Sequence, residues 1–232
     1  MQGSLMAFSL LVLRFTLRYH KTIHYKATAA CGVSFQNKIR EMKQYLESSN
    51  YIDWKTPQIL EKANDLSKGV EGEEALAKAC FEYVRDEIKH SWDFELNPVT
   101  SKASDVLKHG TGYCYAKSHL LAALLRANDI PAGLCYQRVT ISDVPPFCLH
   151  GLNAIYLQNY GWYRVDARGN KEGVDAEFCP PIEKLAFPIV AKGEMTLPEI
   201  WAEPLEMVIK TLKINLTWSQ VAENLPDTEI KS

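Results

Sequence analysis

The sequence predicts an α+β fold, with helices in the first part of the globular chain and an antiparallel β-sheet after them. Before residue 131, apolar residues recur at helical spacing, as at Leu76, Cys80, Val84 and Ile88. Beyond residue 131 the apolar residues are β-branched or aromatic and lie in short runs between turn residues. Consecutive helices followed by hairpin-linked strands are typical of α+β proteins.

Three helices are expected before residue 110. The first begins at Thr56-Pro57, since proline is tolerated in the first turn of a helix. Residues 72–90 continue at helical spacing. A short third helix is expected over residues 104–108, because Gly110 can end it.

The fourth helix begins at Cys114, within the stretch GTGYCYAKSHLLAALLRANDIP (110–131). It is expected to be amphipathic, with an inward stripe of Cys114, Ser118, Leu121 and Leu125. The side of the helix that holds the thiol is therefore predicted to pack against the core.

Three strands are expected next, over residues 132–141, 149–157 and 162–168. The turn residues at 158–161 predict a hairpin between the last two. From about residue 178 the chain is rich in proline and is expected to wrap the outside of the domain.

Length and composition predict one globular domain, over residues 42–232, with an uncertain N-terminal extension over residues 1–41. The 232 residues are 47% hydrophobic, which is enough for a substantial core. The formal net charge of −2 argues against a nucleic-acid-binding surface, which needs clustered Lys and Arg. No nucleic-acid partner is therefore expected.

The N-terminal extension has basic residues but no Asp or Glu before Glu41. Its apolar run, Leu5 to Leu13, is too short to span a bilayer and lacks a preceding basic residue, so it is a poor secretory signal. Two interpretations have equal weight: an organelle transit peptide, or a start codon set too early, with Met42 as the true start. A membrane anchor has less weight. A cytoplasmic location without stable membrane insertion is predicted, and organelle targeting stays open.

The six cysteines do not form a CxxC pair, so the sequence lacks the usual zinc-ribbon pattern. A disulfide framework is not expected without a secretory signal. A metal site that uses Cys148 and His150 is a weak alternative, because two ligands have no matching partners. No metal and no cofactor are predicted.

Cys114 is the candidate nucleophile. Free N–H groups at a helix start have partial positive charge, which favours a thiolate and could stabilise an oxyanion on an attacked carbonyl. The alternative is that Cys114 is a packing residue of a buried helix, as most such cysteines are.

His150 and Asp166 complete the candidate site. The hairpin places them on neighbouring strands, and a Cys-His-Asp arrangement forms if the sheet face of His150 packs on the stripe of Cys114. The alternatives are a structural His150 and an Asp166 that serves as a turn residue paired with Arg168. His119 lies about 140° around the helix from Cys114 and should face elsewhere. His90 and His109 are expected at helix ends.

With these residues the sequence resembles the transglutaminase-like superfamily of papain-like thiol enzymes, over about residues 75–190. The resemblance depends on Gly110–Ala132, His150 and GWYRVDARGN (Gly161–Asn170). It implies a papain/transglutaminase-like core in which the cysteine-bearing helix packs on an antiparallel sheet. It also implies that Cys114 is the nucleophile, His150 the general base and acid, and Asp166 the orienting carboxylate.

The resemblance implies a cysteine hydrolase or acyltransferase of the small single-domain type. The de-N-glycosylating amidases of this superfamily have CxxC pairs, and its calcium-regulated crosslinkers have extra β-sandwich domains. The expected partner is a peptide or protein substrate with a reactive amide, such as a glutamine-type amide, that reacts through a thioester. The alternative is a non-catalytic scaffold with the same fold. The acceptor, the oxyanion-hole side chain and the oligomeric state stay open, although Trp92, or another residue of KHSWD (89–93), is a candidate for the oxyanion hole.

Overall fold

A computed structural model of the chain describes residues 42–228. The N-terminal extension (1–41), with the transit-peptide, start-codon and anchor hypotheses, lies outside the described residues. Within 42–228, none of the helices has both the length and the apolar character needed to cross a bilayer.

The described elements, in chain order, are η1 (Gln44–Leu46), α3 (Pro57–Ser67), α4 (Glu73–Glu82), η2 (Tyr83–Glu87), β1 (Lys89–His90), α5 (Ala103–His109), β2 (Thr111–Gly112), α6 (Cys114–Ala127), β3 (Ala132–Thr140), β4 (Phe147–Leu157), β5 (Gly161–Val165), β6 (Glu177–Cys179), β7 (Ile182–Lys184), β8 (Met195–Thr196), α7 (Glu206–Ile214) and α8 (Trp218–Glu223).

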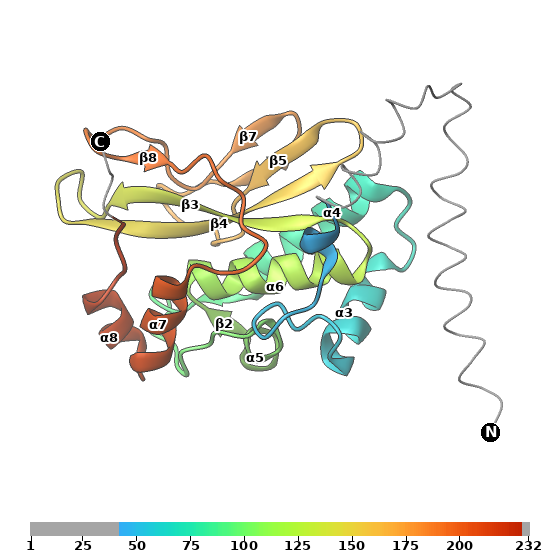
Figure 1. Cartoon of the computed structure of the whole chain (residues 1–232), viewed down its shortest axis with the longest axis horizontal. Helices are drawn as coiled ribbons and strands as arrows, with labels where there is room; N and C mark the ends of the chain where they lie inside the picture. Colours follow the sequence, from blue (N-terminus) through green and yellow to red (C-terminus); the bar gives the residue numbers. More distant parts are fainter. Residues whose placement is uncertain (1–41, 229–232) are drawn as a thin grey trace. The chain divides into compact units, whose positions relative to one another are not determined.

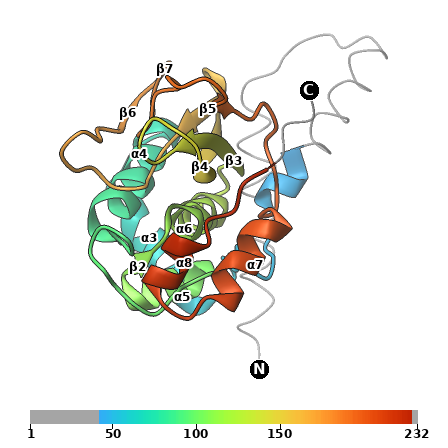
Figure 2. The same cartoon turned by 90° about the vertical axis from the view of Figure 1, so that its left-hand side faces the viewer.

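The predicted α+β class is confirmed. An antiparallel sheet with strand order β5-β4-β3-β8 lies against one layer of helices, and α6 is the helix that packs on β3 and β4 (Figure 1). Figure 2 shows α6 almost end-on, with α3, α4 and α5 around it. The helix that begins at Cys114 is therefore the central helix of the fold.

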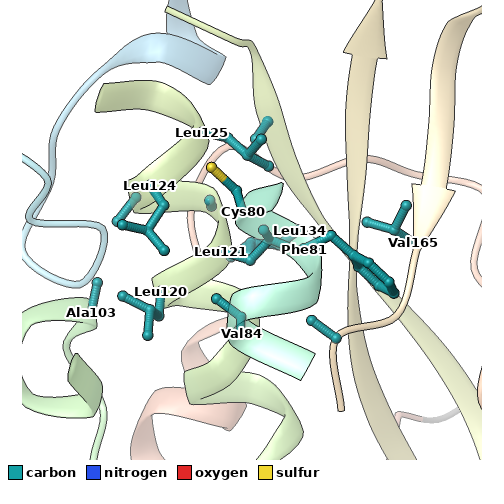
Figure 3. Close-up of a cluster of buried hydrophobic side chains, with 14 of the residues drawn as sticks. Cys80, Phe81, Val84, Ala103, Leu120, Leu121, Leu124, Leu125, Leu134 and Val165 are labelled. Atoms are coloured by element: carbon teal, nitrogen blue, oxygen red, sulfur yellow. The ribbon is translucent and has the colours of Figure 1, made fainter. Parts of the chain in front are cut away.

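The main core fills the space between α6 and the sheet. Figure 3 shows side chains from α4, α6, β3 and β5 meeting there, among them Phe81, Leu121, Leu134 and Val165. Each of these four side chains is at most 1% exposed. Burial of this kind is the main favourable contribution to folding, at about 25 cal/mol per Å² of apolar surface.

Helix α6 differs from the predicted amphipathic helix because it is buried on all sides. Every residue from 114 to 126 is buried, including Lys117 and Arg126. Buried cations need hydrogen-bond partners, and backbone carbonyls supply them here. Lys117 donates to the carbonyl of Ile88, and Arg126 donates to the carbonyls of Glu47, Ala132 and Ala202. The predicted inward stripe was therefore too narrow.

The strand register leaves one end of β4 beyond the reach of β5. Strand β3 pairs with β4 from Ala132↔Ile155 to Thr140↔Phe147, which is almost the full length of β4. The pairing of β4 with β5 covers only Asn153–Leu157 in the described structure. Residues 147–152 therefore project past the end of β5, and we call them the β4 overhang.

The helix predicted over residues 72–90 ends earlier than expected. After α4 the chain widens into one π-helical turn, η2, and then becomes extended at β1, which pairs in parallel with β2. His90 therefore lies in a strand and not at a helix end, contrary to the prediction. His109 is the last residue of α5, and Gly110 ends that helix in the left-handed conformation (φ 64°), as predicted.

The proline-rich C-terminal part is more regular than the sequence suggested. It forms the hairpin β6–β7, the sheet strand β8, and helices α7 and α8. In α7, the buried residues Val208, Ile209 and Leu212 have the spacing of an amphipathic helix, a signal that the sequence analysis missed. Helices α7 and α8 lie near the start of α6, the end of that helix at which Cys114 stands (Figure 1).

Candidate active site

Cys114, His150 and Asp166, the three residues predicted from the sequence, lie together. The His150 Nε2 and Asp166 Oδ2 atoms are 2.6 Å apart. The backbone N–H of Gly151 donates to the Cys114 sulfur at 3.4 Å, and Cys114 lies close enough to the His150 imidazole to raise its pKa. Because Nε2 faces the carboxylate, Nδ1 is the ring nitrogen available to the thiol.

The start of α6 is shaped by close packing around Gly112. A Cβ at this position would lie 3.1 Å from the Thr100 hydroxyl and 3.2 Å from the Ala116 Cβ. Tyr113 follows with an extended backbone at the N-cap, and the helix begins at Cys114. The glycine thus lets the chain enter the helix in a crowded part of the core, which fixes the position of the thiol.

The three side chains meet at the edge of the sheet and not on its face. The sequence analysis assumed that the face of His150, Leu152 and Ala154 packs on α6, and this was wrong. Leu152 and Ala154 pack with Cys135 in a separate cluster, away from the main core. Asn153, on the other face, points to α6 and donates to the carbonyl of Ser118 at 2.9 Å.

The β4 overhang explains how the residues still meet. Along β4, alternate N–H groups point to β3, and the others point to the opposite edge of the strand. In the β4 overhang that opposite edge is not paired with β5, so its N–H groups can bind other parts of the protein. The Gly151 N–H binds the Cys114 sulfur in this way. A Cβ at Gly151 would lie 2.9 Å from the Tyr115 ring and 3.1 Å from the Tyr115 Cα, so glycine is needed for the close approach of α6.

Asp166 follows β5 directly and reaches the same edge. Extended by one residue, the β4–β5 register places it opposite Leu152, and so diagonal to His150. Its Oδ1 accepts from the Arg168 N–H and its Oδ2 from the Ala186 N–H, both at 3.1 Å. These bonds satisfy a carboxylate that is 0% exposed.

The alternative interpretation of Asp166 as the ion partner of Arg168 was wrong. The Arg168 guanidinium instead forms a two-bond fork with Asp93, at 2.7 and 3.0 Å. Lys171 binds the same carboxylate at 2.7 Å. The carboxylate of Asp166 is therefore left to the imidazole and to backbone N–H groups.

The electrostatics of the site favour a protonated imidazole. Burial opposes the charged form of His150, but the negative charges of Asp166 and of the Cys114 thiolate outweigh it, with help from the hydrogen bonds to both groups. Together they raise the pKa of His150 to about 10. For Asp166, burial favours the neutral acid, yet the His150 charge and the hydrogen bonds hold the carboxyl pKa below its usual value.

Two residues lie near the imidazole although the sequence analysis did not place them there. The Phe187 ring stands edge-on to the His150 ring, with centroids 4.8 Å apart at 86°. His90 pairs with Gly112, two residues before Cys114, and within residues 42–228 its Nδ1 has no hydrogen-bond partner. Burial and the charge of Arg168 lower the His90 pKa well below its usual value, so this ring is neutral. The two-residue strands that place His90 here give no periodic signal in the sequence.

The other residues considered for the site are His119 and Cys148. The His119 Nδ1 pairs with the Ser101 carbonyl at 2.7 Å, and burial lowers the His119 pKa to about 4. Cys148 is 7% exposed and close enough to Cys114 for the thiolate charge to act on it. Across residues 42–228, no three His, Cys, Asp or Glu side chains are grouped as a metal site requires.

Comparison with known proteins agrees with the resemblance inferred from the sequence. The family model of the transglutaminase-like superfamily matches residues 61–167, a range that includes Cys114, His150 and Asp166. The resemblance to this superfamily, whose members are generally cysteine proteases or transglutaminases, is thereby confirmed. Among curated proteins, no sequence matches the chain significantly.

Solved structures with partial similarity include a candidate cysteine protease from Cytophaga hutchinsonii, with 20% identity, a TM-score of 0.46 and coverage of 55% of this chain and 42% of that one. The periplasmic domain of TgpA from Pseudomonas aeruginosa has 21% identity and a TM-score of 0.43, over 56% of this chain and 47% of that one. A structure described as a TGase has 15% identity and a TM-score of 0.32, over 69% and 37%. The similar part thus spans less than half of each of these chains.

Proposed function

Since residues 61–167 form a transglutaminase-like core, we propose that the protein is a cysteine-dependent acyl hydrolase or acyl transferase that acts on peptide or protein amides through a thioester. Cys114 is the nucleophile, His150 the general acid and base, and Asp166 the group that orients the imidazole. The observation that supports this best is the chain of contacts from the Cys114 sulfur through the imidazole to the 2.6 Å contact with Asp166.

In the first step the Cys114 thiolate attacks the carbonyl carbon of the amide. The negative charge that develops on the carbonyl oxygen is stabilised by backbone N–H groups at the start of α6. His150, which is protonated at neutral pH because its pKa is raised to about 10, gives its proton to the departing amine. The products of this step are a thioester on Cys114, a free amine and a neutral imidazole.

In the second step the neutral imidazole accepts a proton from the incoming acceptor. A water molecule gives a carboxylic acid, and a primary amine gives a new amide; in both cases the Cys114 thiolate leaves and the imidazolium is restored. Asp166 keeps the ring oriented and stabilises its charge throughout. Both acceptors are consistent with the same residues, so hydrolysis and transfer are proposed together.

A non-catalytic scaffold with this fold is the second candidate. The observation that favours it is the low exposure of the central groups, since Cys114 is 7% and His150 4% exposed. A protein that binds partners without turnover has no need for a reactive thiol. The two candidates therefore differ in the reactivity of Cys114.

The deciding experiment is alkylation by iodoacetamide at neutral pH, with the modified cysteines identified by mass spectrometry. Cys179 is an internal reference, because its side chain is the more accessible of the two. The enzyme hypothesis predicts faster modification of Cys114 than of Cys179, and loss of this advantage in His150→Ala. It also predicts a thioester adduct with an activated ester, absent in Cys114→Ala. Equal or slower modification of Cys114, without an adduct, would favour the scaffold.

A further inference from the structure

The C-terminal end of the described chain lies along the β4 overhang, close to Cys114. We propose that residues 225–227 occupy the groove that binds an extended peptide substrate, and that Arg138 is the subsite for an acidic side chain of that substrate. This inference rests on the proposed function and adds to it the chemical class of the substrate.

One backbone hydrogen bond joins the segment to the free edge of β4. The Leu149 N–H donates to the Pro226 carbonyl at 2.7 Å. Two residues further along the same edge, the Gly151 N–H donates to the Cys114 sulfur. N–H groups two residues apart on one strand edge are separated by about 7 Å. The Pro226 carbonyl and the Cys114 sulfur therefore bind successive N–H groups of the same edge. Addition of an extended peptide to a sheet edge is a common mode of peptide recognition.

Arg138 holds the carboxylate of Asp227 in a two-bond fork. Its Nε donates to Oδ1 and its Nη2 donates to Oδ2, each at 2.6 Å. The guanidinium has other contacts that keep it in place, since it lies 3.7 Å from the centroid of the Phe147 ring and donates to the Gly193 carbonyl at 3.1 Å. A planar guanidinium held in this way is well suited to bind a carboxylate of another peptide.

The chain that leads into this segment also passes close to the thiol. Before it reaches the β4 overhang, the chain passes the start of α6, where the Tyr113 hydroxyl donates to the Trp218 carbonyl. Leu225 then packs on the main core and Pro226 is buried. In Figure 1 this part of the chain rises from α8 to the ends of β3 and β4. On this proposal, a peptide that adds to the β4 overhang beside Cys114 must displace residues 225–227.

The contacts of the segment are compatible with displacement. Its fork with Arg138 is partly exposed to solvent, with side chains 14% (Arg138) and 35% (Asp227) exposed. A carboxylate of an added peptide can therefore reach the guanidinium and compete with Asp227 for it. Helix α8, in contrast, is fixed by a capping box at Thr217 and by the buried Val221. The end of the chain can therefore leave the groove while α8 stays in place.

The binding test uses a chain that ends at Asn224, with Cys114→Ser to prevent turnover, and a fluorescein-labelled peptide ENLPDTEI that copies residues 223–230. Fluorescence anisotropy should show binding to the shortened chain, and binding about tenfold or more weaker to the full chain, whose own segment competes at high effective concentration. The peptide ENLPNTEI should bind about tenfold more weakly than ENLPDTEI to the shortened chain. On Arg138→Gln the two peptides should bind alike. Absence of binding to a folded shortened chain, or equal binding of both peptides, would overturn the proposal.

A second measurement covers the case in which the shortened chain does not fold. In the full chain with Cys114 intact, Asp227→Asn should raise the alkylation rate of Cys114 relative to Cys179, and Arg138→Gln should do the same. Glu223→Gln, on the exposed side of α8, is the matched control and should change nothing. Unchanged rates in both variants would also overturn the proposal. Because peptide binding is measured without turnover, its failure is distinct from a failure of the thiol to react.

Discussion

The Nε2 atom of His150 and the Oδ2 atom of Asp166 are 2.6 Å apart in the interior, where the two side chains are 4% and 0% exposed. A buried pair of opposite charges is costly to break, because the remaining charge loses its partner. The pair comes from two neighbouring strands that end at different places, and it connects the sheet to the start of α6. The predictions below depend on it or on the packing around it.

The substitution Asp166→Asn should reduce amide turnover by roughly 10³–10⁴-fold, as loss of the orienting carboxylate does in comparable triads. The His150 pKa should fall from about 10 towards its ordinary value of 6.5, because the largest stabilising charge is removed. As the pH is raised, activity that needs the imidazolium should then be lost at a lower pH than in the wild type. NMR titration of His150 checks the shift, and an unchanged titration would contradict the assigned role of Asp166.

The stability that His150 provides should depend on pH in a defined direction. Its pKa is higher in the folded protein (about 10) than the ordinary value of 6.5, so folding binds a proton. The contribution is therefore complete below about pH 6.5 and is lost as the pH rises towards 10. In urea unfolding, the difference in free energy of unfolding between wild type and His150→Gln should shrink over this window.

His119 should give the opposite trend and serves as the control. Burial lowers its pKa from 6.5 to about 4, so the folded protein favours the neutral ring. The stability that the neutral ring provides is complete above about pH 6.5 and is lost as the pH falls towards 4. The difference between wild type and His119→Gln should therefore shrink on acidification. The same trend for both histidines would show that one assignment is wrong.

Gly151→Ala should damage activity more than stability. The added Cβ meets both the ring and the backbone of Tyr115 at 2.9–3.2 Å, so α6 must move away from β4. Overpacking of this kind costs about 1–3 kcal/mol. The shift also separates Cys114 from His150, which should reduce turnover well beyond the loss of folded protein.

Arg168→Gln should destabilise the loop that follows Asp166. Its fork with Asp93 is nearly buried, with side chains 9% and 14% exposed, and the loss leaves Asp93 with Lys171 and with His90, whose Nδ1 lies 3.6 Å from the carboxylate. We expect a loss of about 1–3 kcal/mol in chemical unfolding. The His90 pKa should rise, because burial and the Arg168 charge are its main depressing causes. Lys171→Gln, at a side chain that is 48% exposed, should have little effect on either quantity.

The sequence was informative where physical signals are local. The helix at Cys114 and the strand pair that includes His150 follow from periodicity and turn residues within a short stretch. Asp166 was expected inside the second strand of this pair, but β5 ends at Val165 and Asp166 follows it. The face of β4 that packs on α6 could not be inferred, because both faces of this strand are buried and its residues show no alternation of apolar and polar positions. His90 and Phe187 depend on contacts between distant segments, and short strands and loops give no periodic pattern.

The complete burial of α6 has a further consequence for the motions of the protein. Amide groups inside such a helix exchange with solvent only when the whole structure opens, whereas segments with few buried contacts exchange through local fluctuations. The thiol is thus mounted on the slowest-exchanging part of the fold. In deuterium exchange, the amides of residues 118–126 should label last, and those of residues 225–228 should label first.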